Sequence, residues 1–332
     1  MSMRFLPKSF GRLPQGARLD KIKCSPNYRD GKFMNQHATP RLISKNKVAL
    51  LMKFMFRNSK DLRPDREVQV VKSDLKSIDI QENILVWFGH SSYMIQIAGK
   101  RFLVDPVFYK AAPISFANRP FKGTDAFAAD DLPSIDFLII THDHWDHLDY
   151  KLVTMLKDKV GKVICPLGVG EDFEYWGYDS DDIIEMDWND DHTLCPDIVI
   201  HCLPARHFSG RGLIPEKTLW ASFLMETPQK NIFIGGDGGY DTHFAEIGKR
   251  FPSIDLAFLE NGQYNENWKY IHLLPKYLVQ VTKDLNAKAV FTVHHSKYAL
   301  SDHPWNEPLD NIKKASESIN VITAQIGEIK EL

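Results

Sequence analysis

The stretch Thr141-His-Asp-His-Trp-Asp-His-Leu-Asp149 holds three histidines and three aspartates within nine residues. It follows a mostly apolar run of strand length, residues 135–140, and precedes residues 150–160, whose apolar positions have helical spacing. The stretch is therefore expected to be a loop between a buried strand and a helix. Imidazoles and carboxylates so close together are hard to explain as packing, because each buried polar group needs its own partner. We interpret the loop as a site for divalent metal, rather than as a polar surface turn.

The order of these side chains predicts two metal ions rather than one. His142 and His144 are two residues apart, so on an extended loop they point to the same side and can hold one ion. Asp146 and His147 begin the next turn and are directed differently, which suits a second ion nearby. Two ions that share a water molecule can generate hydroxide at neutral pH. Because one loop cannot complete both coordination shells, further His or Asp ligands are expected from the ends of distant strands.

The composition is that of an ordinary globular protein. The chain has 332 residues, 43% of them apolar and 25% charged, enough for one large domain or two small ones. Its net charge of −2 gives no electrostatic reason to expect nucleic-acid binding. The four cysteines show no C-x-x-C spacing, which argues against a disulfide framework or a zinc finger and favours a reducing compartment. With no apolar stretch of signal-peptide or membrane-spanning length, we predict a cytoplasmic protein.

The beginning of the chain differs in character from the rest. Residues 1–45 are rich in Gly, Pro, Arg and Lys without a regular period, which predicts an extended arm laid over the domain. Residues 46–57 could form a short amphipathic helix; we favour packing on its own domain over contact with a lipid surface, which its basic residues leave open. Residues 58–75 are charged and contain proline, so a loop is expected. The chain is therefore divided into an arm, 1–75, and a main domain, 76–332.

The main domain mixes strand and helix signals without strict alternation, which favours two packed sheets with outer helices. Strands are predicted at 84–88, 93–97, 101–104, 135–140, 161–165, 182–186, 193–203, 219–226, 231–235, 255–259, 288–293 and 320–324. Helices are predicted at 149–159, 170–176, 242–250, 274–286 and 308–317.

The pattern His-x-His-x-Asp-His after a strand resembles the signature of the metallo-β-lactamase superfamily of hydrolases. Two segments, Trp87-Phe-Gly-His-Ser-Ser-Tyr93 and Gly99-Lys-Arg-Phe-Leu-Val-Asp-Pro-Val-Phe108, are similar to the branch that contains the N-acyl-phosphatidylethanolamine-hydrolysing phospholipase D and its bacterial relatives. Ser25-Pro-Asn-Tyr-Arg-Asp-Gly-Lys-Phe33 fits that branch but not the neighbouring L-ascorbate-6-phosphate lactonase branch. The resemblance covers about residues 10–310. It implies an α/β fold, the αβ/βα sandwich of two packed mixed sheets with outer helices, whose site lies at one edge.

The remaining metal ligands follow from this resemblance together with the residues themselves. His207 closely follows the strand run 198–203 and matches the superfamily's next ligand motif. Asp237 follows another strand and lies between glycines that let the backbone approach an ion, and a carboxylate can bridge two cations. An alignment on Tyr298-Ala-Leu300 makes His294 the last ligand, with the adjacent His295 as the fallback.

The predicted ligands form two shells joined by one carboxylate. They are His142, His144 and His207 for the first ion, Asp146, His147 and His294 for the second, and Asp237 as the bridge. The two ions are predicted to be Zn, with Fe or Mn as alternatives that suit the same ligands.

Catalytic roles are assigned to Asp146, already a ligand, and to His272. His272 matches a histidine near the family's catalytic site and could contact a substrate phosphate or protonate a leaving group. Asp105 and His90 fall on loops that the family places beside the metals. Asp105 is expected to orient a ligating imidazole, whereas His90 could equally be a structural histidine.

The resemblance implies hydrolysis of the phospholipase D type, in which a metal-bridging hydroxide attacks an N-acyl-phosphatidylethanolamine-like phospholipid. Two alternatives stay open, a lactonase or sugar-phosphate hydrolase and a non-catalytic metal-binding protein, although a binding module needs no open bridging position. A wide apolar groove beside the metals would favour lipid, and a small basic pocket would favour a sugar phosphate. A small-molecule or phospholipid substrate is the expected partner. Peripheral membrane contact and a homodimer are further expectations that no single residue demonstrates.

Overall fold

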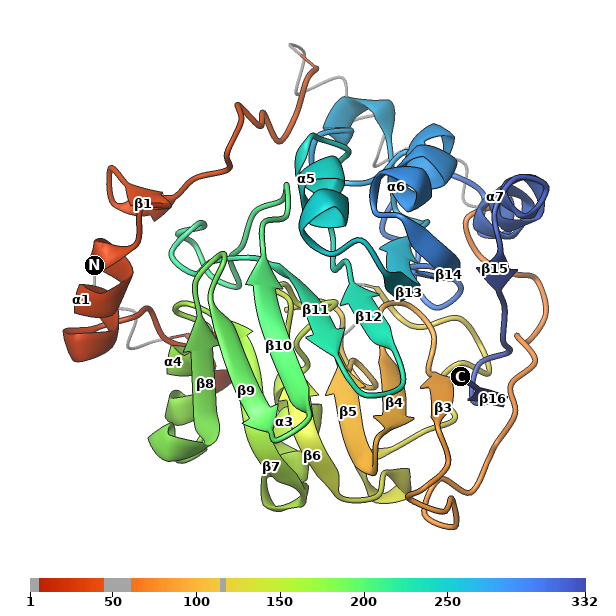
Figure 1. The fold of residues 1–332 in the computed structure, drawn as a ribbon, viewed down its shortest axis with the longest axis horizontal. Coiled ribbons are helices and arrows are strands. Elements are labelled where there is room, and N and C mark those ends of the chain that lie inside the picture. Colours follow the sequence, from red (N-terminus) through yellow and green to blue (C-terminus); the bar gives the residue numbers. More distant parts are fainter. Residues whose placement is uncertain (1–5, 45–60, 114–117) are drawn as a thin grey trace.

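Two seven-stranded sheets lie face to face in the computed structural model, which describes residues 6–44, 61–113 and 118–332 (Figure 1). The first sheet has the strand order β16-β3-β4-β5-β6-β7-β8 and the second the order β15-β14-β13-β12-β11-β10-β9. Helices pack on the outer face of each sheet, so the layers run helix, sheet, sheet, helix. The predicted αβ/βα sandwich is confirmed.

The elements have the following bounds. The first sheet contains β3 Ile84–Trp87, β4 Tyr93–Ile97, β5 Lys100–Val104, β6 Ile135–Ile139, β7 Val160–Pro166, β8 Ile183–Met186 and β16 Ile329–Glu331. The second contains β9 Asp191–Cys195, β10 Ile198–Leu203, β11 Ser222–Glu226, β12 Asn231–Ile234, β13 Ile254–Glu260, β14 Ala287–Val293 and β15 Val321–Ile322. The helices are α1 Gly16–Cys24, α3 Tyr150–Leu156, α4 Gly170–Tyr175, α5 His243–Arg250, α6 Leu278–Asp284 and α7 Glu307–Ser316, and a small hairpin pairs β1 Tyr28–Arg29 with β2 Lys32–Phe33.

Strand β6 illustrates why the layers form. Phe137 and Ile139 belong to the core between the two sheets, whereas Leu138 and Ile140 belong to the core under α3 and α4. Successive side chains of a strand point to opposite faces, so a strand buried on both faces is mostly apolar, and Asp136 is the one charged residue of β6.

The amino-terminal arm is not the purely extended segment that the sequence predicted. It contains the nine-residue helix α1, which lies beside α4 and β8 at the left of Figure 1. A single residue of this helix, Ile22, is buried, so the sequence carries no visible helical period. Its attachment is instead ionic, because Arg18 lies 2.6 Å from Glu185 and 2.8 Å from Glu171. Tertiary contacts, not local pattern, therefore place this helix.

Other predicted elements differ in smaller ways. The predicted strand 193–203 is two antiparallel strands, β9 and β10, and β16 was not predicted. The predicted helix 274–286 begins with a 3₁₀ turn, Pro275–Tyr277, before α6. The predicted amphipathic helix 46–57 lies outside the described residues. Within the described part of the chain, no helix is both long and apolar enough to cross a bilayer.

The strand directions bring the ends of seven strands to one edge of the sandwich. β5 and β6 are parallel, and β3 points the same way because both pairs in β3-β4-β5 are antiparallel. In the second sheet β12, β13 and β14 are parallel, and β10 shares their direction through two antiparallel pairs. Loops that follow these strands therefore meet at one edge, where ligand sites form in such folds.

Candidate metal centre

Three imidazoles form the first cluster of candidate ligands. One ring nitrogen each of His142, His144 and His207 lies within 4.8 Å of the others, and His144 Nδ1 is 3.1 Å from His207 Nε2. His207 Nδ1 lies 2.6 Å from the carbonyl oxygen of Ile271, and because a carbonyl can only accept, this nitrogen donates. The lone pair of His207 is thereby left on Nε2, which faces the cluster. His142 Nε2 is buried and makes no hydrogen bond.

The second cluster lies beside the first. It combines Asp146, His147 and His294 with His90, and its ligand atoms also lie within 4.8 Å of one another. His294 Nε2 is 3.3 Å from Asp146 Oδ2. The ring of His147 has its Nδ1 on Asp105, 2.8 Å away, while its Nε2 is buried without a hydrogen bond.

Asp237 lies between the two clusters. Its Oδ2 is 3.2 Å from Nε2 of both His147 and His294 and 3.8 Å from Nε2 of His207, while its Oδ1 is buried without a partner. The preceding Gly236 has φ +61°, and a Cβ there would lie 2.9 Å from the side chain of Thr141, so this tight turn requires glycine. The loop after β12 can therefore bring a carboxylate between the clusters.

These donors fit a pair of divalent transition-metal ions. Buried polar atoms without partners are rare, yet His142 Nε2, His147 Nε2 and Asp237 Oδ1 are all of this kind. These three residues also form a further group of candidate ligands, which joins the first cluster to the second. Imidazole nitrogen and carboxylate oxygen are the ligands that Zn, Fe and Mn accept. Cations between these atoms would satisfy all of them.

The electrostatics divide the imidazoles into two groups. Burial lowers the pKa of His142 and His207 and brings the pKa of His144 to about 4, so these rings are neutral donors at pH 7. Burial alone would also lower the pKa of His147 and His294, but neighbouring carboxylates, chiefly Asp237, outweigh it. The pKa of His147 is raised, and that of His294 is raised to about 10.

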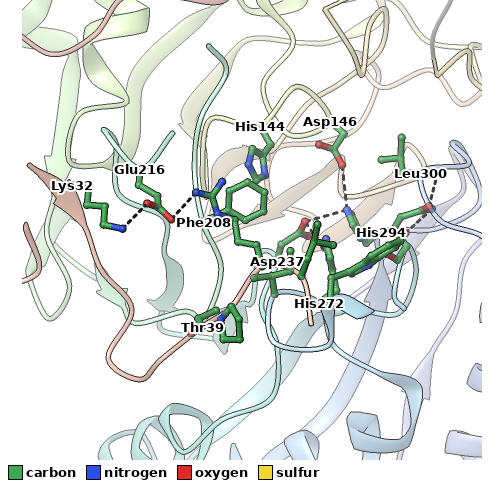
Figure 2. A pocket seen from close by; sticks show the side chains of 16 residues that line it. Lys32, Thr39, His144, Asp146, Phe208, Glu216, Asp237, His272, His294 and Leu300 are labelled. Carbon is green, nitrogen blue, oxygen red and sulfur yellow. Dashed lines mark hydrogen bonds and ion pairs between the residues drawn. The ribbon is translucent and has the colours of Figure 1, made fainter. Parts of the chain in front are cut away.

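A cavity of about 920 Å³ is lined by residues of both clusters (Figure 2). Its wall is mainly apolar, with three charged side chains at some distance from the clusters. The apolar residues are Pro40, Leu42, Phe208, Trp268, Ile271 and Leu300, and the charged ones are Lys32, Arg41 and Glu216. Lys32 and Arg41 both pair with Glu216, at 3.5 and 3.2 Å. The cavity is thus neither a small basic pocket nor a purely apolar groove.

A family model described as the beta-lactamase superfamily domain matches residues 100–295, more than half of the chain. The matched region includes both the 141–149 loop and His294. The chain belongs to the metallo-β-lactamase superfamily.

Relatives of this superfamily member agree with that assignment. An uncharacterized protein of Mycobacterium tuberculosis is 33% identical over 306 residues, 90% of this chain and 82% of the relative. N-acyl-phosphatidylethanolamine-hydrolyzing phospholipase D 1 of Caenorhabditis elegans is 29% identical over 266 residues, 74% of each protein. The crystal structure of CmlA, a diiron β-hydroxylase of Streptomyces venezuelae, has a TM-score of 0.58 at 17% identity over 76% of this chain and 54% of CmlA, which shows a shared fold. At the level of reaction class, the chain is a metal-dependent hydrolase of the superfamily.

The superfamily pattern left a choice between two adjacent histidines after β14. The ring of His294 faces Asp146 and Asp237, as described above. The ring of His295 turns away, with its nitrogens 3.1 Å from Thr292 Oγ1 and 2.7 Å from Ser296 Oγ. The geometry therefore favours His294 over the fallback. Lys297, three residues after His294, is buried and donates to the carbonyl oxygens of Phe88 and Val107.

Asp105 and His90 lie where the resemblance to the superfamily placed them, beside the clusters. Asp105 is buried and accepts from His147 Nδ1, from the Thr141 amide at 2.8 Å and from Thr141 Oγ1 at 2.6 Å. It therefore orients a candidate ligand and fixes the start of the ligand loop. His90 Nε2 is 3.0 Å from Asp146 Oδ2, so His90 is close enough to count as a member of the second cluster.

The 141–149 loop has supports that the sequence did not reveal. Buried Arg211 donates to the carbonyl oxygens of Asp143 and Leu148, at 3.0 and 2.6 Å, and to that of Ser9 in the arm. Asp149 caps α3, accepting from the Lys151 amide at 3.0 Å. Loop shape is thus held from both ends by side chains that do not reach the clusters.

Glu260, the last residue of β13, is a site residue that the sequence analysis missed. It is buried, and its Oε2 is 2.8 Å from His272 Nδ1 and 3.4 Å from His294 Nδ1. Its Oε1 accepts from the amides of Gly238 and Leu273. One carboxylate thus orients the predicted catalytic histidine and a candidate ligand together. The available signal was an acidic residue at the end of an apolar strand, at the same edge as the ligands.

Glu260→Gln is expected to lower kcat by about 10–100-fold, the usual effect of losing a group that orients a metal-site histidine. The amide keeps the size of the side chain but has only one acceptor atom, so it cannot accept from the two imidazoles and also from the amides of Gly238 and Leu273. The matched control is Glu226→Gln, which alters a Glu–His pair on β11 and β10, 2.9 Å from His201 and outside the cavity. Steady-state kinetics of both variants test this role, and equal effects would contradict it.

Proposed function

We propose that this chain is a dinuclear metal-dependent phosphodiesterase of the phospholipase D type, acting on N-acyl-phosphatidylethanolamine-like phospholipids. The observation that carries the proposal is the pair of donor clusters, joined by Asp237, in the wall of a large and mainly apolar cavity. The similarity over most of its length to a phospholipase D of C. elegans supports the same substrate class.

In this proposal His142, His144 and His207 would hold one ion, and Asp146, His147 and His294 would hold the other. Asp237 would supply a carboxylate to both. Zn is the proposed metal, and Fe or Mn would suit the same nitrogen and oxygen donors. Two divalent ions at these positions would lower the pKa of a water molecule towards neutrality and polarise the phosphoryl oxygens of the substrate.

The protein's own groups then bind the substrate and handle a proton. His272 lines the cavity with its Nδ1 held by Glu260, so its Nε2 is left to contact a phosphate oxygen or to protonate the leaving alkoxide. The apolar wall, which includes Leu42 and Trp268, excludes water from acyl chains. Arg41 and Lys32 offer cationic groups to an anionic lipid.

The cavity also argues against the alternative substrate class. Its volume of about 920 Å³ lies near the upper end of ordinary ligand sites, whereas a phosphorylated sugar lactone is small and polar. Peripheral membrane contact would follow from a lipid substrate, because the substrate is delivered from a bilayer. A homodimer remains a prediction of the resemblance.

The test is a substrate panel with the full chain, stripped of metal and then reloaded with Zn. Release of phosphatidic acid from N-acyl-phosphatidylethanolamine is expected from the reloaded protein and not from the stripped one. No release from protein shown to contain both ions would overturn the lipid assignment. Hydrolysis of a phosphorylated sugar lactone in that case would favour the lactonase alternative.

A further inference from the structure

The amino-terminal arm contributes part of the wall of the metal-site cavity. After the β1–β2 hairpin the chain continues over loops of the second sheet (Figure 1), and Thr39, Pro40, Arg41 and Leu42 line the cavity. The hairpin fixes this course, because Phe33 is 1% exposed and its amide donates to the carbonyl oxygen of Glu216. The arm is therefore held next to the loop that carries His207.

Asn35 makes the closest link between the arm and the candidate ligands. Its Nδ2 donates to the carbonyl oxygen of His207 at 2.7 Å, and its Oδ1 accepts from the amide of His207 at 3.1 Å. The same Oδ1 accepts from Nε1 of Trp220, a fully buried ring, at 3.2 Å. One side chain thus pairs with both backbone polar groups of His207, as a neighbouring strand would.

His207 depends on such outside contacts because no strand holds it. β10 ends at Leu203, and the ligand lies four residues beyond in irregular structure. Its ring is fixed at Nδ1 by the carbonyl oxygen of Ile271, and its peptide groups by Asn35. The preceding Arg206 is also tied to the arm, donating to Thr39 Oγ1 at 3.0 Å and to the carbonyl oxygen of Ala38 at 2.8 Å.

We propose that Asn35 is a positioning residue of the metal centre, and that the amino-terminal arm therefore contributes to metal binding. The inference rests on the proposed role of His207 as a ligand. Loss of a polar group that orients a metal ligand typically lowers metal affinity or activity by about 10–100-fold. Here the group that is oriented is the backbone of His207. The residue that orients it, Asn35, lies some 170 residues earlier in the sequence.

Asn35→Ala is expected to weaken binding of one ion, the one at the His207 cluster, by about 10–100-fold. The affinity is measured by competition of the full chain with a chromophoric chelator, using Zn alone, together with the number of ions retained per chain. The matched control is Asn27→Ala, because Asn27 lies in the same arm and uses its Nδ2 on Asp187, 3.0 Å away. Unfolding of the metal-free proteins separates metal affinity from stability.

A selective loss in Asn35→Ala, with metal-free unfolding like that of Asn27→Ala, would support the proposal. Unchanged affinity, or an equal loss in both variants, would overturn it. Asn35→Asp keeps the acceptor for the His207 amide and loses the donor to the His207 carbonyl oxygen, so an intermediate metal affinity is expected. This variant replaces Asn35→Ala in the test if the alanine variant does not fold. His207→Ala is the reference variant. If it retains both ions, the assignment of His207 as a ligand is wrong. If it loses an ion while Asn35→Ala does not, only the positioning role of Asn35 is wrong.

Discussion

Asp237→Ala is expected to reduce hydrolysis by about 10³-fold or more, the upper range for removing one central electrostatic group from an active site. The side chain is 2% exposed, and its Oδ2 lies within 3.2–3.8 Å of nitrogens from both clusters. Its loss leaves His147 and His294 without the carboxylate that they share. The variant should therefore retain fewer ions per chain as well as less activity, measured by metal analysis and phosphatidic acid release.

Two comparisons sharpen this experiment. Asp237→Asn keeps the shape and loses the charge, so an intermediate loss of metal is expected if charge between the ions is the dominant contribution. Asp130→Ala removes an exposed carboxylate on the 3₁₀ turn Ala129–Asp131, far from the clusters in the fold, and should behave like the unaltered protein. A fully active Asp237→Ala with normal metal content would refute the bridging role.

Much of this site could be predicted because its ligands obey a local rule. His142, His207, Asp237 and His294 each follow an apolar run, and strand direction brings the ends of these runs to one edge. Short motifs next to strands are visible in a sequence. The sandwich was predictable for the same reason, since strands such as β6 are apolar on both faces.

The supporting residues could not be predicted in this way. Asn35 and Arg211 act on backbone groups of residues distant in sequence, and nothing near either residue indicates its partner. Helix α1 was missed because ion pairs with Glu171 and Glu185, not an apolar stripe, hold it in place. In the sequence Glu260 is an ordinary acidic residue at the end of a strand, and only the fold brings it within 2.8 Å of His272. Contacts across the fold, rather than local pattern, define this second group.

Metal uptake at pH 7 is expected to release about two protons per chain from the imidazole ligands, because metal ligands must be deprotonated. In the metal-free protein the pKa of His294 is about 10 and that of His147 is also raised, so both rings carry a proton at pH 7. The pKa values of His142, His144 and His207 are lowered by burial, so those rings have none to lose.

The sign of the pH dependence follows from this competition. A group with a raised pKa stays protonated until the pH passes that pKa, so each rise in pH removes a competitor of the metal. Release of two protons predicts that the combined affinity for both ions increases about 100-fold per pH unit around neutrality. Titration calorimetry in buffers of different ionisation enthalpy counts the protons, and chelator competition at several pH values measures the slope.

The controls assign the protons to individual rings. His294→Gln should lower the count by about one, because it removes one of the two protonated imidazoles. His243→Gln alters a buried histidine on α5 whose pKa is lowered to about 4, and should leave the count unchanged. A release near zero with a flat affinity profile would mean that His147 and His294 are neutral before metal arrives. In that case Asp237 and Asp146 would lie beside neutral imidazoles in the metal-free protein, not beside the protonated imidazoles that we infer.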